Sequence, residues 1–409
     1  MANTLITPSI IAKEALFQLN NNLVMGQLVH RDYAREFAKV GSTISIRKPV
    51  KFVATTGATR SNSDVTEGTV SLAIDTQKHV SWKFSSNELT LTIEDYSERY
   101  IKPAMIELAQ VVESSLMGLY ATVPNWVGTA GTTPSTFLEV GAARQRLVEN
   151  MTPPGSDLHA VIDPAAALKI ANDMKLQFQP GKQLTAMEKV KVGRYAGFDT
   201  YEAQSIVNHT VGSHGSGAAK GTPLVNGASQ HSNSSPQANS QSLVTDGITN
   251  STTGWVKAGD IITIAGVYAI NEKTYQAYSR LRQFVVTADA NSDGSGNSTL
   301  TISPAIVTSG PYANCSAAPA DNAAITVVTG VASTAYAQNL CFHKNAFALV
   351  MADLEMPDGA AFKARESMNN LSVRVVKSYN IDNDEDIIRL DILYGVKTIY
   401  PQLACRLTG

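Results

Sequence analysis

Hydrophobic residues recur at helical spacing in four stretches of the chain, which predicts four amphipathic helices. The first follows Thr7 and Pro8, an N-cap and a proline at the first helical position. The longest would span about 40 Å at about 1.5 Å per residue, and Pro103 in its first turns moves its expected start toward Lys102. Beyond the first, the expected helices cover 95–121, 138–150 and 165–174.

Apolar and polar residues alternate with a period of two in other stretches, which predicts strands. Three such runs between 41 and 84 predict a long β-hairpin with a mobile, hydrophilic tip over 55–68. The segment 345–351 is expected to be a short helix or a strand end, and 388–392 to be the antiparallel partner of 371–375. Further strands are expected at 158–162, 261–267, 283–287, 299–302, 325–331 and 400–407.

Strand signals without helices fill the stretch 211–335, whereas helices and strands alternate on both sides of it. This order predicts an α+β domain interrupted by an independently folded all-β domain. Around the start of that stretch, the tract 208–255 is rich in Ser, Asn, Gly, Thr and Gln, and its only ionised side chains are Lys220 and Asp246. Such low complexity predicts a loop or linker.

The composition narrows the class of protein. Of 409 residues 44% are apolar and 17% are charged, so the chain can build a large core and is not wholly disordered. A net charge of −2 argues against strong sequence-independent binding to nucleic acid. Three widely spaced cysteines form neither a disulfide framework nor a zinc motif. With no secretion signal at the start and no apolar run of roughly 18 residues, we expect a soluble cytoplasmic protein without a membrane partner.

One tract suggests a metal site. Asp289, Asn291 and Asp293, followed by Gly294, match the first half of a calcium-binding loop, in which oxygen ligands hold a hard cation. The twelfth position should carry a bidentate glutamate and carries Leu300 instead. Because strands are expected on both sides, a hairpin turn is the favoured interpretation of this tract, and we expect no metal.

A second acidic cluster lies between two expected strands and comprises Asp382, Asp384, Glu385 and Asp386. These residues could hold a metal or supply the acid and base of a glycosidase. Neighbouring side chains on a strand point apart, so a solvated turn fits the spacing better. The glycine-rich tract 212–217 lacks the lysine of a phosphate loop, and the seven histidines are scattered. We therefore expect no catalytic residue, no cofactor and no enzyme.

Several phrases of the sequence resemble the major capsid proteins of tailed bacteriophages. The C-terminal segment carries Tyr394, Gly395, Val396 and Pro401 in LDILYGVKTIYPQLACRL, which is similar to the closing strands of that family. The turn VGRYAGFDTYEA and the opening phrases LVHRDYAREF and GSTISIRKP also resemble it. An all-β insertion containing WVKAGDIITIAGV resembles the I-domain of coat proteins of the Salmonella short-tailed phage type.

This resemblance implies the Hong Kong 97 capsid fold and a purely structural function. It implies that the chain assembles with itself, through pentamers and hexamers, into an icosahedral shell around double-stranded DNA. A scaffolding protein and a portal would take part in assembly in the host cytoplasm, and packaged DNA would contact the inner surface only weakly. The protein would then be found in the virion.

In such a shell the hairpin would lie across a neighbouring subunit, with Arg60, Asp64 and Glu67 at its tip as candidate partners for inter-subunit contacts. The resemblance also implies an order of parts. These are an N-terminal arm (1–40), an E-loop hairpin (41–90), a spine helix with part of a peripheral domain (91–135), a first part of an axial domain (136–210), an inserted β-domain (211–336) and a second axial and peripheral part (337–409).

Two other functions stay open at this point. A β-rich carbohydrate- or surface-binding protein would account for the Ser- and Asn-rich tract and the β insertion, although the missing secretion signal argues against it. A hydrolase that uses the acids near Asp384 is the weaker alternative.

Overall fold

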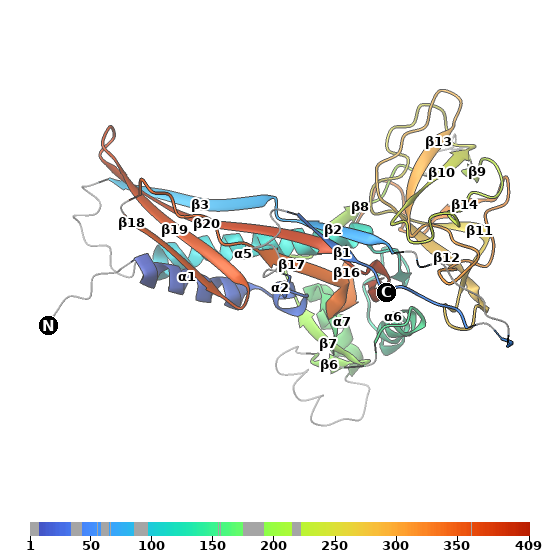
Figure 1. Ribbon diagram of the computed structural model, residues 1–409, viewed down its shortest axis with the longest axis horizontal. Coiled ribbons are helices and arrows are strands. Elements are labelled where there is room, and N and C mark those ends of the chain that lie inside the picture. Colours follow the sequence, from blue (N-terminus) through green and yellow to red (C-terminus); the bar gives the residue numbers. More distant parts are fainter. Residues whose placement is uncertain are drawn as a thin grey trace. The chain divides into compact units, whose positions relative to one another are not determined.

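The computed structural model describes residues 8–33, 43–54, 56–58, 65, 67–85, 97–153, 155, 157–174, 192–214, 222–360 and 362–409. Helices and strands are mixed throughout these residues, which confirms the predicted α+β class (Figure 1). The chain divides into two compact units, each assembled from three segments. Unit 1 contains Met1–Ser45, Ser71–Met117 and Phe347–Lys397; unit 2 contains Ile46–Val70, Gly118–Ala346 and Thr398–Gly409.

Unit 1 is built on a five-stranded sheet in which the order β17-β20-β19-β18 is extended by β3, which also pairs with β20. The helix α1 (Pro8–Asn22) packs against β18, β19 and the longer helix α5 (Lys102–Met117) (Figure 1). Glu113 of α5 accepts the backbone N–H groups of Met25 and Gly26, which fastens the short helix α2 (Met25–Leu28) to α5. The strands are β3 (Thr76–Ser85), β17 (Phe347–Met351), β18 (Phe362–Met368), β19 (Leu371–Asn380) and β20 (Glu385–Thr398).

The helix predicted over 95–121 is correct in position, since residues 97–122 are helical without a break, but only its middle part is an α-helix. A π-helical turn (Ser97–Ile101) precedes α5 (Lys102–Met117), and a 3-10 turn (Gly118–Thr122) follows it. The start at Lys102 agrees with the effect expected of Pro103, which stands in the first turn where a missing N–H breaks no helical hydrogen bond. At about 1.5 Å per residue, α5 spans roughly 24 Å instead of about 40 Å.

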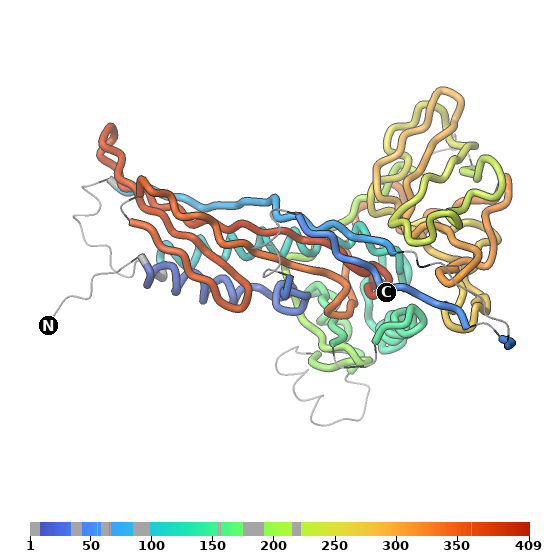
Figure 2. Tube along the Cα trace, viewed as in Figure 1, coloured from blue at the N-terminus to red at the C-terminus, as the bar shows by residue number. Residues whose placement is uncertain are grey.

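The region predicted as one long hairpin is divided between two sheets. The first two runs form β1 (Thr43–Arg47) and β2 (Thr69–Ala73), which make a two-stranded sheet. The third run forms β3, which pairs along its whole length with β20, from Thr76 opposite Tyr394 to Ser85 opposite Glu385. Figure 2 shows this pairing as a blue segment beside an orange-red one.

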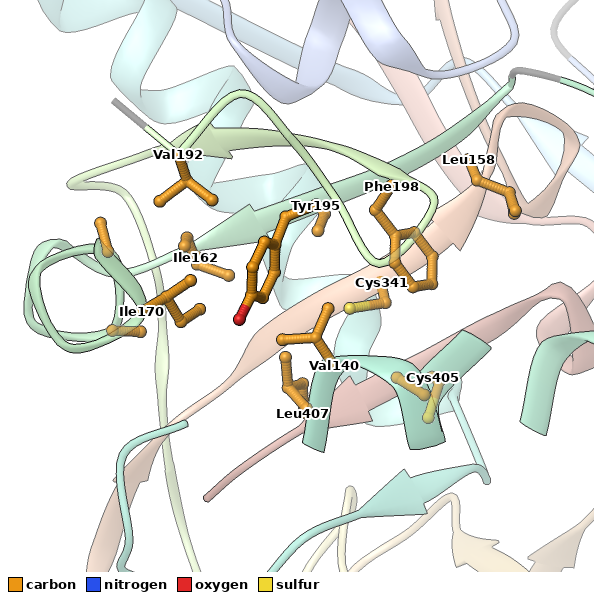
Figure 3. Packing of buried hydrophobic residues seen from close by; sticks show 14 of the residues in the cluster. Val140, Leu158, Ile162, Ile170, Val192, Tyr195, Phe198, Cys341, Cys405 and Leu407 are labelled. Atoms are coloured by element: carbon orange, nitrogen blue, oxygen red, sulfur yellow. The ribbon is translucent and has the colours of Figure 1, made fainter. Parts of the chain in front are cut away.

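Unit 2 contains a six-stranded sheet of order β4-β21-β16-β5-β7-β6, with helices α6 (Phe137–Glu149) and α7 (Pro164–Met174) packed into the core beside it. Because β16 pairs with β5 on one edge and with β21 on the other, residues from both sides of the β insertion complete one sheet. Figure 3 shows the core, where Val140, Phe198, Cys341 and Leu407 are buried together. The strands are β4 (Trp126–Val127), β5 (Leu158–Ile162), β6 (Arg194–Tyr195), β7 (Phe198–Glu202), β16 (Asn339–His343) and β21 (Ala404–Leu407).

The helices at 137–149 and 164–174 lie where they were predicted, and local chemistry explains their starts. Thr136 accepts the N–H of Glu139, whose carboxylate accepts the Thr136 N–H in return, so a capping box begins α6. Asp163 accepts the N–H of Ala166 at 3.1 Å and satisfies a free donor in the first turn of α7.

A second six-stranded sheet in unit 2, of order β14-β11-β12-β13-β10-β9, forms the β-domain. Its core surrounds the buried Trp255 and includes Phe284 and Ile302. The strands β8 (Asn208–Thr210) and β15 (Ala335–Ala337) pair with each other where the chain enters and leaves this stretch. The sheet consists of β9 (Leu224–Val225), β10 (Gln241–Asp246), β11 (Ile261–Ile270), β12 (Ala277–Val286), β13 (Ser298–Ser303) and β14 (Ile325–Val327).

The prediction of a loop or linker over 208–255 is wrong for the described part of that tract, which supplies β8, β9 and β10 and the core residue Trp255. This tract has few apolar side chains, and its amide side chains stabilise it by hydrogen bonds to the backbone. The Gln230 Oε1 accepts the Val244 N–H at 2.7 Å, and the Gln230 amide donates to the carbonyls of Asn226 and Val244. Side-chain amides thus satisfy backbone groups in a segment with little apolar surface to bury.

Candidate functional site

Of the three candidate contact residues predicted at the hairpin tip, Arg60 and Asp64 fall outside the described residues. Glu67 lies at the base of the hairpin and not at its tip, because it stands just before β2 and its Oε2 lies 3.2 Å from Nη1 of Arg47, the last residue of β1. Both side chains are exposed, and an ion pair of this kind contributes at most about 1 kcal/mol. Such a weak pair is readily exchanged for another partner, so the role of these three residues in inter-subunit contacts stays a prediction.

The base of the hairpin is attached to the β-domain within unit 2. The Lys51 N–H donates to the Tyr312 hydroxyl at 3.0 Å, and the Lys51 ammonium pairs with Glu272. Gln237 donates to the same hydroxyl at 2.6 Å and its carbonyl accepts from the Lys48 ammonium at 3.3 Å. We call Lys48, Lys51, Gln237, Glu272 and Tyr312 the hairpin anchor.

The hairpin anchor is packed as well as hydrogen-bonded. A Cβ at Gly68 would lie 2.8 Å from the Cβ of Gln237, so only glycine fits at this crossing. Burial lowers the pKa of Lys48, which shows that its ammonium is partly removed from water. The direction of the hairpin is therefore set by the β-domain of the same subunit. Sequence patterns did not identify the anchor, because its residues are distant in the chain and belong to no motif.

Asp260 stands at the centre of a buried polar network in unit 2. The Oδ1 accepts from His209 Nε2 at 2.8 Å and from the Thr329 hydroxyl at 2.9 Å. The Oδ2 accepts the N–H groups of Gly212 at 2.9 Å and Lys257 at 2.8 Å. Burial alone would raise the pKa of the Asp260 carboxyl, but hydrogen bonds from His209, Lys257 and Gly212 outweigh it and hold that pKa below its ordinary value.

The proton positions in this network follow from the partners. Burial raises the pKa of Tyr120, so its hydroxyl stays protonated and can donate to His209 Nδ1, 3.1 Å away. His209 then carries its proton on Nε2 and donates it to Asp260. The composition of 208–255 predicted a polar linker around His209, whereas this residue is buried and joins the turn before β4, β8 and the start of β11.

Arg406 of β21 is fully buried next to this network. Its guanidinium donates to the carbonyls of Val123 at 3.1 Å and Gly259 at 2.7 Å and lies 5.2 Å from the centre of the Tyr120 ring. Burial lowers the pKa of Arg406 to about 10, which leaves the side chain charged at neutral pH. These contacts join the last strand of the chain to the β-domain, and the Arg406 Nη2 is buried without a hydrogen-bond partner among the described residues.

The calcium interpretation of 289–300 is not supported by the geometry. Asp289 accepts the Ala258 N–H at 2.7 Å, and Asn291 accepts the Gly254 N–H at 2.7 Å. Asp293 accepts the N–H groups of Ser295 and Asn297, both at 2.8 Å. Each of the three side chains therefore accepts backbone N–H groups from a different part of the chain. Over the described ranges, no group of three His, Cys, Asp or Glu side chains is arranged to hold a metal ion.

The acidic cluster at 382–386 is likewise divided among separate partners. Asp384 has a φ of 48° and accepts from the Tyr379 hydroxyl at 2.7 Å. Glu385 pairs with Lys83 at 2.6 Å, and Asp386 pairs with Lys377 at 3.1 Å. Bonds of this kind belong to a turn and its flanking strands, and the site of an acid and base pair does not form.

Several large apolar side chains are exposed on the isolated subunit. Phe52 and Val65 lie on the hairpin, Leu138 on α6, Leu168 on α7 and Ile381 at the turn between β19 and β20. Exposed apolar surface of this kind is typical of protein contacts. Within the described residues, no helix is both long enough and apolar enough to cross a membrane.

A family model described as P22 coat protein, gene protein 5, matches residues 1–409. No curated protein matches the chain. Among solved structures, one from Mycobacterium phage Che8 is 12% identical, with a TM-score of 0.49 and coverage of 94% of this chain and 90% of the other. The capsid structure of the cyanophage P-SCSP1u is 10% identical, with a TM-score of 0.48 and coverage of 94% and 87%. The CUS-3 coat protein I-domain is 28% identical, covering 28% of this chain and 99% of its own, with a TM-score of 0.20.

Proposed function

The chain belongs to the P22 coat protein family, which makes it the major capsid protein of a phage shell, and from this premise we propose how it assembles. It is a structural protein of the virion and associates with copies of itself. The match to the family over all 409 residues carries this conclusion. We propose that the subunits join as pentamers and hexamers of the Hong Kong 97 type around double-stranded DNA, without catalysis.

The segments of the chain fit the parts of such a subunit. In this proposal, 1–40 form the arm, 41–90 the E-loop, 91–135 the spine helix and part of a peripheral domain, 136–210 with 337–409 the axial and peripheral parts, and 211–336 the I-domain. The pairing of β8 with β15 supports a domain inserted at one point of the chain. A scaffolding protein and a portal would assist assembly in the host cytoplasm, and packaged DNA would contact the shell weakly.

The E-loop would hold a neighbouring subunit through its tip. The hairpin anchor supports this function because it attaches the hairpin to the β-domain of the same subunit. The exposed side chains of Phe52 and Val65 belong to this hairpin. Arg60, Asp64 and Glu67 would form ion pairs across the contact. Each such pair is weak, but every subunit of a closed shell repeats it.

Electron microscopy of the chain expressed with its scaffolding protein tests this proposal. We expect closed shells from the unchanged chain, whereas a chain that stays monomeric at high concentration would contradict the proposed assembly. Deleting 55–66 keeps Gly68, whose carbonyl accepts the Lys48 N–H at 2.8 Å, and should give a folded subunit that assembles poorly.

A triple alanine variant of Arg60, Asp64 and Glu67 separates the charges from the length of the tip. The matched control replaces Lys102, Asp75 and Glu107, exposed residues with the same charges in unit 1. We expect shell yield to fall for the tip variant and to stay near wild type for the control. Normal shells from both the tip deletion and the tip variant would exclude a clamping function for the tip.

A further inference from the structure

Unit 2 contains a cavity of about 390 Å³ that is lined by strand β12 of the β-domain and by helix α6. Arg146 and Glu149 of α6 line it together with Arg280 and Gln283 of β12, and Trp126 of β4 forms part of the wall. A cavity of this size lies at the lower end of the range for small-molecule sites. It can hold one small polar group and its immediate contacts.

The charges that line the cavity do not balance. Both oxygens of Glu149 already have partners: Oε2 accepts from Nε and Nη2 of Arg280 at 3.1 and 2.6 Å, and Oε1 accepts from the Gln145 amide at 2.9 Å. Arg146 donates to the neutral amide oxygen of Gln283 at 3.2 Å, and no carboxylate in the described part of the chain forms an ion pair with it. Two guanidinium groups face one carboxylate, so the cavity carries one excess positive charge.

The surroundings add to this excess. Arg282 follows Arg280 by two residues on β12, is buried, and has an Nε without a hydrogen-bond partner among the described residues. Burial lowers the pKa of Arg146, and the positive charge of Arg280 lowers it further. The Arg146 guanidinium is thus charged in an environment that disfavours a cation, and an anion in the cavity would relieve that cost.

We propose that this cavity binds an oxyanion group, of the phosphate or carboxylate type, through the guanidinium of Arg146. A guanidinium is planar and offers paired N–H donors at the spacing of two oxygens of a carboxylate or phosphate. Gln283 orients Arg146, and its own oxygen is fixed because it also accepts the Trp126 N–H at 2.9 Å. Arg280, held by Glu149, supplies a second positive charge at the wall. The site goes beyond shell formation and would bind an anion within each subunit.

Isothermal titration of the full-length chain with inorganic phosphate, and separately with acetate, tests the site at constant ionic strength. We expect saturable binding of at least one of the two, and the stronger one identifies the source as phosphate-like or carboxylate-like. Arg146→Gln should weaken it tenfold or more, the effect of losing a charge-assisted hydrogen bond. The matched control is Arg144→Gln, an exposed arginine on the same helix, which should change the affinity less than twofold.

Glu149→Gln provides a test that a folding defect cannot imitate. Removing the only carboxylate of the cavity raises its excess charge, so the affinity for the same anion should increase several-fold. Failure of both anions to saturate, equal losses in Arg146→Gln and Arg144→Gln, or unchanged affinity in Glu149→Gln would each overturn the proposal.

Discussion

The buried carboxylate of Asp260 gives the most direct test of the physical account of unit 2. Asp260→Leu keeps the number of side-chain heavy atoms and removes the acceptor of four hydrogen bonds. His209 and Thr329 can turn into other bonds, since an imidazole can change tautomer and a hydroxyl can rotate. The backbone N–H groups of Gly212 and Lys257 are fixed and lose their acceptor.

The magnitude follows from those two donors. Each buried N–H left without a partner costs about 1–3 kcal/mol, so the two together predict a loss of about 2–6 kcal/mol. The lowered pKa of Asp260 indicates that its hydrogen bonds outweigh the cost of its burial. Removing the carboxylate should therefore lower the free energy of unfolding. Asp260→Asn should cost less, about 1–3 kcal/mol, because its remaining oxygen can face the two backbone donors while His209 and Thr329 accept from its amide.

Equilibrium urea unfolding of the full-length chain, followed by tryptophan fluorescence, measures these losses. Trp126 and Trp255 are both buried in unit 2 and report its unfolding. The control is Asp289→Leu, where the side chain is exposed and water can replace the one bond it accepts from Ala258. Two results would refute the reasoning. One is an Asp260→Leu variant whose free energy of unfolding lies within about 1 kcal/mol of wild type, and the other is an Asp260→Asn variant that is less stable than Asp260→Leu.

The pH dependence gives an independent check. An unfolded aspartate titrates near about 3.9, and the folded pKa of Asp260 is lower. The stability that its ionised form contributes is therefore fully present above the unfolded value and is lost as the pH falls through the folded pKa. Because asparagine does not titrate, the gap between wild type and Asp260→Asn should be constant above about pH 5 and narrow below about pH 4.

Three further predictions concern the sheet of β5, β7, β16 and β21 and the buried thiols. Phe198→Ala should lower the free energy of unfolding by about 3–5 kcal/mol because it empties a fully buried site. Leu168→Ala, at an exposed site, is the control and should change it by less than about 0.5 kcal/mol. Calorimetry measures both changes. Gly197→Ala should cost about 1–2 kcal/mol in the same assay, because φ is +88° and the new Cβ would lie 2.8 Å from the Arg144 guanidinium; an unchanged melting temperature would contradict this. Burial raises the pKa of Cys315 and Cys405 to about 12 and that of Cys341 well above its ordinary value, so an aromatic disulfide reagent at pH 8 should react with none of them until urea is added; rapid reaction of the folded chain would disprove their burial.

Periodicity located most elements but not their partners. The alternation at 388–392 correctly predicted a strand antiparallel to 371–375, since a short turn joins the two. The strand β3 was placed in a hairpin with its neighbours, although it pairs with β20, about three hundred residues later. Alternation shows that a strand has a buried face and does not show which edge it joins.

The polar residues of unit 2 were the hardest to foresee. His209, Asp260 and Arg406 lie far apart in the sequence, and each reads as an ordinary surface residue until the fold brings them together. Likewise the tract 208–255 has the composition of a linker, because amides such as that of Gln230 replace the apolar side chains that a pattern search needs. The one signal available was Trp255, a large residue that rarely stays exposed in an otherwise polar segment.

The pairing of β8 with β15 has a consequence for how such proteins diversify. Thr210 lies opposite Ala335, so the two ends of the β-domain meet as neighbours on adjacent strands. A tight turn could join these two positions without rerouting the chain on either side, and a different module could be spliced into the same gap. Such an exchange would keep the strand order of the remaining chain intact, but it would also remove the Gly259 carbonyl that accepts from the buried Arg406 and the partners that hold Lys51.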